Sequence, residues 1–429
     1  MRHAVIIGGG MAGLVASAVA ARHFEQVTML DKETLPSAPH PRKAVPQGNH
    51  VHALLKSGEL FLSELFPNFR EEALSSGCLE FKVRSQWRTY GPNGWIEPVD
   101  IGLTALSQSQ PLIEHVVRKL VSRLQNVSVL SGCVDDLQRV GDTIGVILVN
   151  GTRINANLVV DASGRGGGTT KWLASLGGSN VPCEEYRPEI RYASTFFSRS
   201  INKGPNYGGW LMFTPAPETK GAVALPVEND RWLVTAYTRF GEAMPRVEKE
   251  FRDFLRDLPD SKISNLISDE IAQARISNYA IDTVRFRRFD KIADAMPEGY
   301  IPLGDTIATF SPINAQGISV AALQAKELHE ALATHKGEDS WRSIVSRNYI
   351  KKSAIPAEWA WDLCQALDAG FENLRGTISA SAHDLSQTIR QVAENAGKHP
   401  ELVGAMGRAI HLLESPRTFV QQVRNTLDA

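Results

Sequence analysis

The stretch AVIIGGGMAGLVASAVAARHFEQVTMLD, residues 4–31, decides the fold of this 429-residue chain. A short β-branched run from His3 to Ile7 precedes three glycines, and Met11 to His23 carries small and apolar residues at helical spacing. Gln26 to Asp31 is a second apolar run. This order predicts a β-strand, an α-helix and another β-strand within the first 31 residues.

Three glycines occupy the point where the first strand gives way to the helix. Gly8, Gly10 and Gly13 form a G-x-G-x-x-G pattern, which provides a tight turn, room for a pyrophosphate and close packing of helix on strand. The free N–H groups of the helix start bind phosphates. Asp31 ends the second strand about 20 residues on, where an acceptor for ribose hydroxyls is expected. The motif predicts a dinucleotide site without distinguishing NAD from FAD.

Composition excludes several classes of protein. Lys and Arg total 46 against 47 for Asp and Glu, so the formal net charge is -1 and nothing favours nucleic acid as a partner. The four cysteines are scattered without a CxxC pair, which favours a reducing compartment, and we predict no metal site. No run of about 18 apolar residues could span a membrane. We expect a soluble, cytoplasmic protein.

The next part of the chain continues the alternation of helices and strands. A helix is predicted from about Pro111 to Leu124, with a strand at Val127 to Leu130. Asn150-Gly151 then separates two apolar runs and predicts a hairpin with a type I′ turn, because both central residues of that turn need positive φ. The second arm is expected to run on into the strand that ends at Asp161.

Residues from about Arg191 to Tyr237 predict a separate sheet of several strands, followed by a helix at Met244 to Leu258. A strand at Tyr300 to Leu303 and a helix at Gln316 to Thr334 come next, and the last ninety residues are expected to be wholly helical. Aromatic residues in the sheet suit an apolar ligand, although core packing is their commoner use: Trp87, Trp95, Tyr192, Phe196, Phe197 and Trp210.

Two later segments favour FAD as the dinucleotide. One is the strand end Asp161-Ala162-Ser163-Gly164-Arg165, and the other is Gly304-Asp305 followed by Phe310, Pro312, Gln316 and Gly317. In this order the segments resemble the FAD monooxygenases of the para-hydroxybenzoate hydroxylase fold. The resemblance is closer to a bacterial subgroup that includes polyether epoxidases, through RKAVPQGNHVHALL at 42–55, the blocks 221–232 and 304–325, and His411-Leu412-Leu413 with Ser415-Pro416.

The resemblance implies roles for the second segment. Asp305 would bind the ribityl or pyrophosphate region, Pro312 would line the flavin, and the Gly317-Ile318 amides would face the N1–C2=O edge. A helix start there would stabilise the negative charge of reduced flavin. Asp305 could instead be a turn residue, and Asp161 and Arg165 could serve only to end their strand. Ser109-Gln110 replaces the family's frequent Ser-Arg, which puts an arginine contact to the flavin in doubt.

His50 and His52 lie in the loop that the family places near the flavin ring, beside the substrate cavity. Histidine can carry protons near neutral pH, so both are candidate catalytic residues. The alternative is that they only hydrogen-bond the loop or the FAD.

We therefore predict an α/β protein with a Rossmann-like FAD-binding domain of the para-hydroxybenzoate hydroxylase type. Its segments are 1–85, 111–185 and 286–340, with an inserted β-sheet substrate domain at 86–110 and 186–285 and a C-terminal helical region at 341–429. The predicted cofactor-binding residues are Gly8, Gly10, Met11, Ala12, Gly13, Asp31, Lys32, Arg42, Gln47, Asp161, Arg165, Asp305, Pro312, Gly317 and Ile318.

The resemblance implies a monooxygenase that inserts one atom of O2 into a small apolar substrate, by epoxidation or hydroxylation, through a flavin C4a-hydroperoxide. NAD(P)H, or reduced flavin from a partner reductase, would supply the electrons. The alternatives are a flavin-dependent reductase or halogenase on the same fold, and a dinucleotide-binding protein without catalysis. No Trp-x-Trp-x-Ile-Pro segment marks a halogenase.

Overall fold

The opening strand–helix–strand unit forms as predicted, as β1 (His3–Ile7), α1 (Met11–Ala21) and β2 (Gln26–Asp31). In the computed structural model, which describes residues 2–91, 93–200, 208–335 and 337–428, β1 is the central strand of a parallel five-stranded sheet. Its neighbours are ordered β19-β11-β1-β2-β7, with β7 at Val127–Ser131, β11 at Leu158–Asp161 and β19 at Tyr300–Pro302. Helix α1 packs on β1, β2 and β11, and the strands β9 (Thr143–Leu148) and β10 (Arg153–Ala156) also contact β11 and β1, so residues 4–7 of β1 are buried and apolar.

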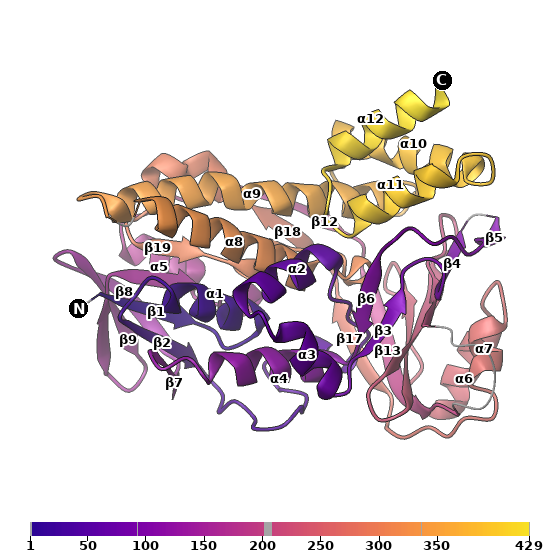
Figure 1. Ribbon diagram of the computed structural model, residues 1–429, viewed down its shortest axis with the longest axis horizontal. Coiled ribbons are helices and arrows are strands. Elements are labelled where there is room, and N and C mark those ends of the chain that lie inside the picture. The colour runs from indigo at the N-terminus through magenta and orange to yellow at the C-terminus, as the bar shows by residue number, and fades with distance from the viewer. Residues whose placement is uncertain (1, 92, 201–207, 336, 429) are drawn as a thin grey trace.

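A second, seven-stranded sheet lies at the other end of the molecule (Figure 1). The helices α6 (Glu248–Arg256) and α7 (Lys262–Leu266) pack on it. The helix predicted at Met244 to Leu258 begins later, at Glu248, because Val247 is still extended. The strands of this sheet all fall within the ranges predicted for the substrate domain, in the order β17 (Ser277–Ile281), β13 (Ile190–Ser198), β16 (Arg231–Thr238), β15 (Lys220–Val227), β14 (Gly209–Met212), β4 (Trp87–Gly91) and β5 (Gly94–Trp95).

Three smaller sheets complete the strand content of the described residues. They are the antiparallel group β8 (Val134–Val140), β9 (Thr143–Leu148) and β10 (Arg153–Ala156), the pair β3 (Leu79–Lys82) and β6 (Thr104–Ser107), and the group β12 (Cys183–Arg187), β18 (Val284–Arg287), β20 (Ala308–Thr309) and β21 (Arg375–Gly376).

The predicted hairpin is present, but the prediction of a type I′ turn is wrong. The Leu148 amide donates to the Thr152 carbonyl oxygen at 2.9 Å, so the loop has three residues rather than two. Only Gly151 has a positive φ, of 84°, while Asn150 accepts a hydrogen bond from the Thr152 amide at 3.0 Å. A three-residue loop needs a left-handed conformation at one position only. The second arm also ends at β10, since β11 belongs to the five-stranded sheet.

Long helices lie against the parallel sheet and lead into the tail. α8 (Gly317–His335) and α9 (Trp341–Asp368) run side by side, and α1 packs beneath α8 (Figure 1). The other helices before the tail are α2 (Lys56–Leu65), α3 (Phe69–Ser75), α4 (Gln110–Val121) and α5 (Thr169–Ser175).

The tail contains α10 (Ala380–Asn395), α11 (Pro400–Ile410) and α12 (Pro416–Leu427). It is not wholly helical, because β21 pairs with β12 between α9 and α10. Among the described residues, none of the helices has the length and apolarity needed to cross a membrane.

His411 attaches the tail to the rest of the molecule. Its Nδ1 accepts a hydrogen bond from the Lys56 amide at 3.0 Å, and its carbonyl oxygen accepts one from the Ser57 amide at 3.3 Å. The first N–H groups of a helix have no partner within the helix, so His411 caps the N-terminus of α2. Burial, and to a smaller extent the Lys56 charge, lowers the pKa of His411 to about 4.

This cap predicts a loss of stability in acid. Because unfolded histidine titrates near 6.5, the unfolded chain binds the extra proton first, and the contribution of His411 is complete above about pH 6.5 and falls toward pH 4. The change is at most about 3 kcal/mol. His411→Asn retains an acceptor at the Nδ1 position but does not titrate, so its thermal midpoint should fall less than that of the wild type between pH 7.5 and 4.5.

His383→Asn, at an exposed position of α10, is the matched control and should follow the wild-type curve. Parallel curves for the wild type and His411→Asn would show that the cap does not titrate.

Candidate functional site

A cavity of about 570 Å³ opens at the carboxyl ends of β1, β2 and β11. Its walls come from the glycine turn, the loop at 42–52, the turn after β11 and the segment 304–318. Tyr192 and Tyr279 of the seven-stranded sheet complete it. The cavity therefore lies where ligands bind in open α/β sheets and also reaches the second sheet.

The three motif glycines have different surroundings. Gly8 has a φ of 109°, which few other residues adopt. A Cβ on Gly13 would lie 1.7 Å from the Gly8 carbonyl oxygen, so α1 packs directly on the turn. A Cβ on Gly10 would meet nothing within 4 Å. The space beside Gly10 is thus open to a ligand, as the phosphate-binding motif requires.

Asp31 is the centre of a buried charge cluster. Its Oδ2 accepts hydrogen bonds from the Gly9 amide and from Arg42, both at 2.7 Å, and its Oδ1 accepts from the Glu33 amide at 2.8 Å. Arg42 also pairs with Glu114 at 3.2 Å. A carboxylate offers about four acceptor positions, so Asp31 retains capacity for a ribose hydroxyl.

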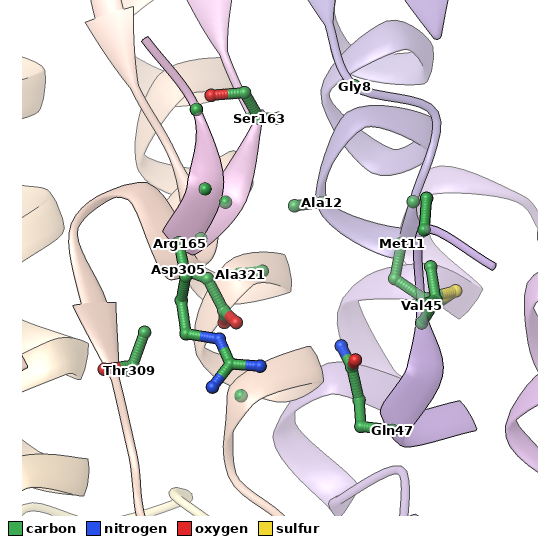
Figure 2. A pocket seen from close by; sticks show the side chains of 18 of the residues that line it. Gly8, Met11, Ala12, Val45, Gln47, Ser163, Arg165, Asp305, Thr309 and Ala321 are labelled. Atoms are coloured by element: carbon green, nitrogen blue, oxygen red, sulfur yellow. The ribbon is translucent and has the colours of Figure 1, made fainter. Parts of the chain in front are cut away.

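Figure 2 shows Arg165 and Asp305 on one wall of the cavity, with Met11, Val45 and Gln47 on the opposite wall. No described group hydrogen-bonds the Asp305 carboxylate. Burial raises the pKa of Asp305, while the nearby Arg165 and Arg285 oppose that shift. Asp305 is therefore an available acceptor in the cavity.

Two helices begin at this cavity. α1 starts at Met11 and α8 at Gly317, and the lining includes Met11, Ala12, Gly317 and Ile318. The Leu14 amide donates to the Gly10 carbonyl oxygen in α1, and the Val320 amide donates to the Gln316 carbonyl oxygen in α8. The amides that precede Leu14 and Val320 in each helix therefore have no intrahelical acceptor. Both helix starts carry partial positive charge. The cavity suits an elongated ligand with negative charge at two places.

Two predicted cofactor residues, Gly13 and Asp161, do not line the cavity. Gly13 serves the packing role described above. Asp161 is fully buried and accepts hydrogen bonds from Ser163, from Thr169 at 2.7 Å and from Tyr300 at 2.6 Å. Its carboxylate points into the protein, so the prediction that Asp161 contacts a ligand directly is wrong. Asp161 instead holds the turn that carries Arg165.

The other predicted residues come together around the cavity. The lining includes Gly8, Gly10, Met11, Ala12, Asp31, Lys32, Arg42, Gln47, His50, His52, Arg165, Asp305, Pro312, Gly317 and Ile318. Their roles toward a ligand stay predictions. No group of three or more His, Cys, Asp or Glu side chains suited to a metal ion occurs in the described ranges.

The two histidines are held by different partners. His50 is 2% exposed, and its Nδ1 lies 2.6 Å from the Ser194 hydroxyl. His52 donates from Nδ1 to the His50 carbonyl oxygen at 3.0 Å. Burial, and to a smaller extent His52, lowers the pKa of His50 to about 3, and burial also lowers the pKa of His52. Both imidazoles are therefore neutral near pH 7.

Sequence reasoning missed several lining residues. Tyr279 contacts Arg165 through its hydroxyl, and Glu114 accepts a hydrogen bond at 2.9 Å from Gln110, the residue already noted in place of the family's arginine. A polar pair four residues apart at a helix start was an available signal for Gln110 and Glu114. Among the six aromatic residues singled out from the sequence, only Tyr192 lines the cavity. Trp87, Trp95, Phe197 and Trp210 pack in the cores around the seven-stranded sheet.

Comparison by sequence gives a curated relative but no family model. No protein-family model matches the chain. A curated relative, Protein Rv3254 of Mycobacterium tuberculosis, is 29% identical over 358 residues, covering 77% of this chain and 73% of the relative.

Two solved structures match almost the whole chain. The flavin-dependent brominase Bmp2 superposes with a TM-score of 0.67 at 14% identity, covering 99% of both chains. The p-nitrophenol 4-monooxygenase PnpA of Pseudomonas putida DLL-E4 gives a TM-score of 0.64 at 15% identity, covering 96% of this chain and 99% of PnpA. The predicted fold class is confirmed: the chain has the α/β fold of flavin-dependent monooxygenases, with a helical C-terminal region.

The glycine geometry generates a paired test. Gly10→Ala adds a methyl group in open space, so the apoprotein should keep its thermal midpoint while FAD affinity falls tenfold or more, about 1.4 kcal/mol. Gly13→Ala must displace the Gly8 carbonyl and should lower the thermal midpoint even without ligand. Differential scanning fluorimetry and FAD titration measure the two effects. An unstable Gly10→Ala apoprotein, or its unchanged FAD affinity, would contradict the assignment.

Proposed function

We propose that this protein is an FAD-dependent monooxygenase that inserts one oxygen atom from O2 into a small apolar molecule. The observation that carries the proposal is the convergence of the glycine turn, the free Asp305 carboxylate and the start of α8 on one cavity. FAD carries phosphates at its centre and gains negative charge on its ring when reduced, which matches two helix starts in one site.

The residues divide the tasks of binding. The amides at the start of α1 would hold the pyrophosphate, Asp31 the adenosine ribose and Asp305 the ribityl chain. The Gly317 and Ile318 amides would stabilise negative charge at the ring edge, with Pro312 packed against the ring. Bound FAD supplies the electron transfer and oxygen activation, and the protein supplies position, electrostatics and exclusion of water.

Epoxidation is the reaction that we favour over aromatic hydroxylation. An alkene needs no deprotonation before oxygen transfer, and the depressed pKa of His50 makes that residue a poor base near neutral pH. The resemblance of the segments 42–55, 221–232 and 304–325 to the polyether epoxidase subgroup supports the same choice. NAD(P)H, or reduced flavin from a partner reductase, is the proposed source of electrons.

The proposal is tested by loading and turnover. The protein is incubated with FAD, desalted and examined for bound flavin, then reduced chemically and mixed with O2 and alkene, polyketide, terpenoid or aromatic compounds. We expect bound flavin and products heavier by one oxygen atom. When the reaction is run with 18O2, that atom should carry the label. Gly10→Ala is the control for FAD-dependent turnover.

Other outcomes identify the alternatives. A colourless protein that binds no FAD would contradict the cofactor and the enzyme together. Halogenated product formed only with bromide or chloride would indicate a halogenase, as in the brominase of similar fold. Saturation of an alkene without O2 would indicate a reductase. Parallel reactions with NADPH alone, and with a flavin reductase added, identify the electron source.

A further inference from the structure

His50 has one ring nitrogen that is paired and one that is not. Nδ1 lies 2.6 Å from the Ser194 hydroxyl, but Nε2 is buried and has no hydrogen-bond partner among the described residues. The ring is close to those of Tyr192 and Tyr279, with centroid distances of 5.5 Å and 5.7 Å. All three side chains line the cavity. A buried polar atom without a partner needs an explanation, and a group of a bound ligand in the cavity supplies one.

The partners of Ser194 favour one position for the His50 proton. The Thr235 hydroxyl accepts a hydrogen bond from the Val51 amide at 2.9 Å, and its own proton has the Ser194 oxygen, at 2.6 Å, as its available acceptor. Ser194 then has its proton free to donate to His50 Nδ1. In this arrangement Nδ1 is the acceptor, and neutral His50 carries its proton on Nε2.

We propose that His50 is a fixed hydrogen-bond donor to the substrate: its Nε2–H binds an acceptor oxygen of an uncharged, unsaturated molecule, and Ser194 and Thr235 are the positioning residues that hold this tautomer. The inference rests on the proposed function for the identity of the ligand but not for the tautomer. In this role His50 recognises the substrate and does not transfer a proton.

The position of His50 favours the substrate over FAD as its acceptor. Ser194 belongs to β13 and Thr235 to β16, so the seven-stranded sheet orients the ring. Tyr192 and Tyr279 provide aromatic surfaces near the His50 ring, which suit a flat apolar molecule with one polar atom. A neutral donor suits a carbonyl, hydroxyl or ether oxygen, and burial keeps His50 neutral.

The tautomer can be measured without turnover. The chain has 11 histidines, so 15N-histidine NMR spectra of the protein, with and without FAD, are assigned by His50→Gln and His52→Asn. We expect the His50 proton on Nε2 and the His52 proton on Nδ1, since His52 donates to a carbonyl oxygen. His52 is therefore an internal reference of opposite tautomer.

Variants separate the relay from simple packing. Ser194→Ala removes the donor to Nδ1, and a substantial population of His50 should then carry its proton on Nδ1. Thr235→Ser retains the hydroxyl group and should keep the wild-type tautomer. A proton on Nδ1 in the wild type, or an Nε2 proton unchanged in Ser194→Ala, overturns the assignment.

Ligand selectivity tests the acceptor. The probes are 1-acetonaphthone and 1-isopropenylnaphthalene, which have similar shapes but differ in the carbonyl oxygen, and calorimetry measures their binding to the FAD-loaded protein. The wild type should bind the ketone at least fivefold more tightly than the alkene. His50→Gln places an amide donor near the Nε2 position and should keep the preference, whereas His50→Asn should lose it.

Three other outcomes of the binding measurements distinguish the substrate, FAD and the proposed function. Absence of a preference for the ketone in the wild type, including absence of binding, overturns the substrate assignment. A tenfold loss of FAD affinity in His50→Asn but not in His50→Gln identifies FAD as the acceptor and overturns it as well. Failure to bind FAD contradicts the proposed function, while the tautomer measured in the FAD-free protein stands separately.

Discussion

The backbone of α1 lies so close to the preceding turn that a Cβ on Gly13 would come within 1.7 Å of the Gly8 carbonyl oxygen. This contact places the start of α1 directly above the carboxyl end of β1. The same helix sets the position of the segment before α8, because a Cβ on Gly304 would lie 2.8 Å from the Cβ of Ala12. Two helix starts, distant in sequence, therefore meet at one cavity. Their partial positive charges therefore act on the same cavity.

Buried charge around the cavity is tolerated because it is paired. Asp31, Arg42 and Glu114 satisfy one another next to the glycine turn, and Arg239 pairs with the fully buried Asp368 behind the seven-stranded sheet. Breaking such a pair leaves an uncompensated charge in a poorly solvated place. Asp305 differs from these groups, since its carboxylate has no hydrogen-bond partner in the described structure. This contrast separates charges that hold the fold from a charge that is available to a ligand.

The loop at 42–55 joins the two parts of the molecule. Arg42 binds to the end of β2, whereas the Val51 amide and His50 bind to hydroxyl groups of the seven-stranded sheet. The histidines thus have a structural task as well as a place in the cavity. Their depressed pKa values follow from that burial and make them better suited to hydrogen bonding than to proton transfer near neutral pH.

Local patterns in the sequence determined the strand–helix–strand opening, the glycine turn and most strands of the second sheet. Helical and strand periodicity, and the need for glycine at a close contact, depend on neighbouring residues and can be read from them. The resemblance to a known family placed Asp305 and Gly317 beside the same ligand. The loop length of the Asn150-Gly151 hairpin was not determined, because an Asn-Gly pair fits loops of two or three residues.

Only the tertiary structure decided which way the side chains point. Asp161 turns into the core because Thr169 and Tyr300 surround it, and the sequence around its strand does not reveal this. His50 and Ser194 are separated by 144 positions, and Tyr279 approaches Arg165 from a different sheet. Such pairs depend on how β13, β16 and β17 pack against the loop. The sequence predicted a dinucleotide site at the glycine turn, whereas long-range packing decided which groups face the cavity.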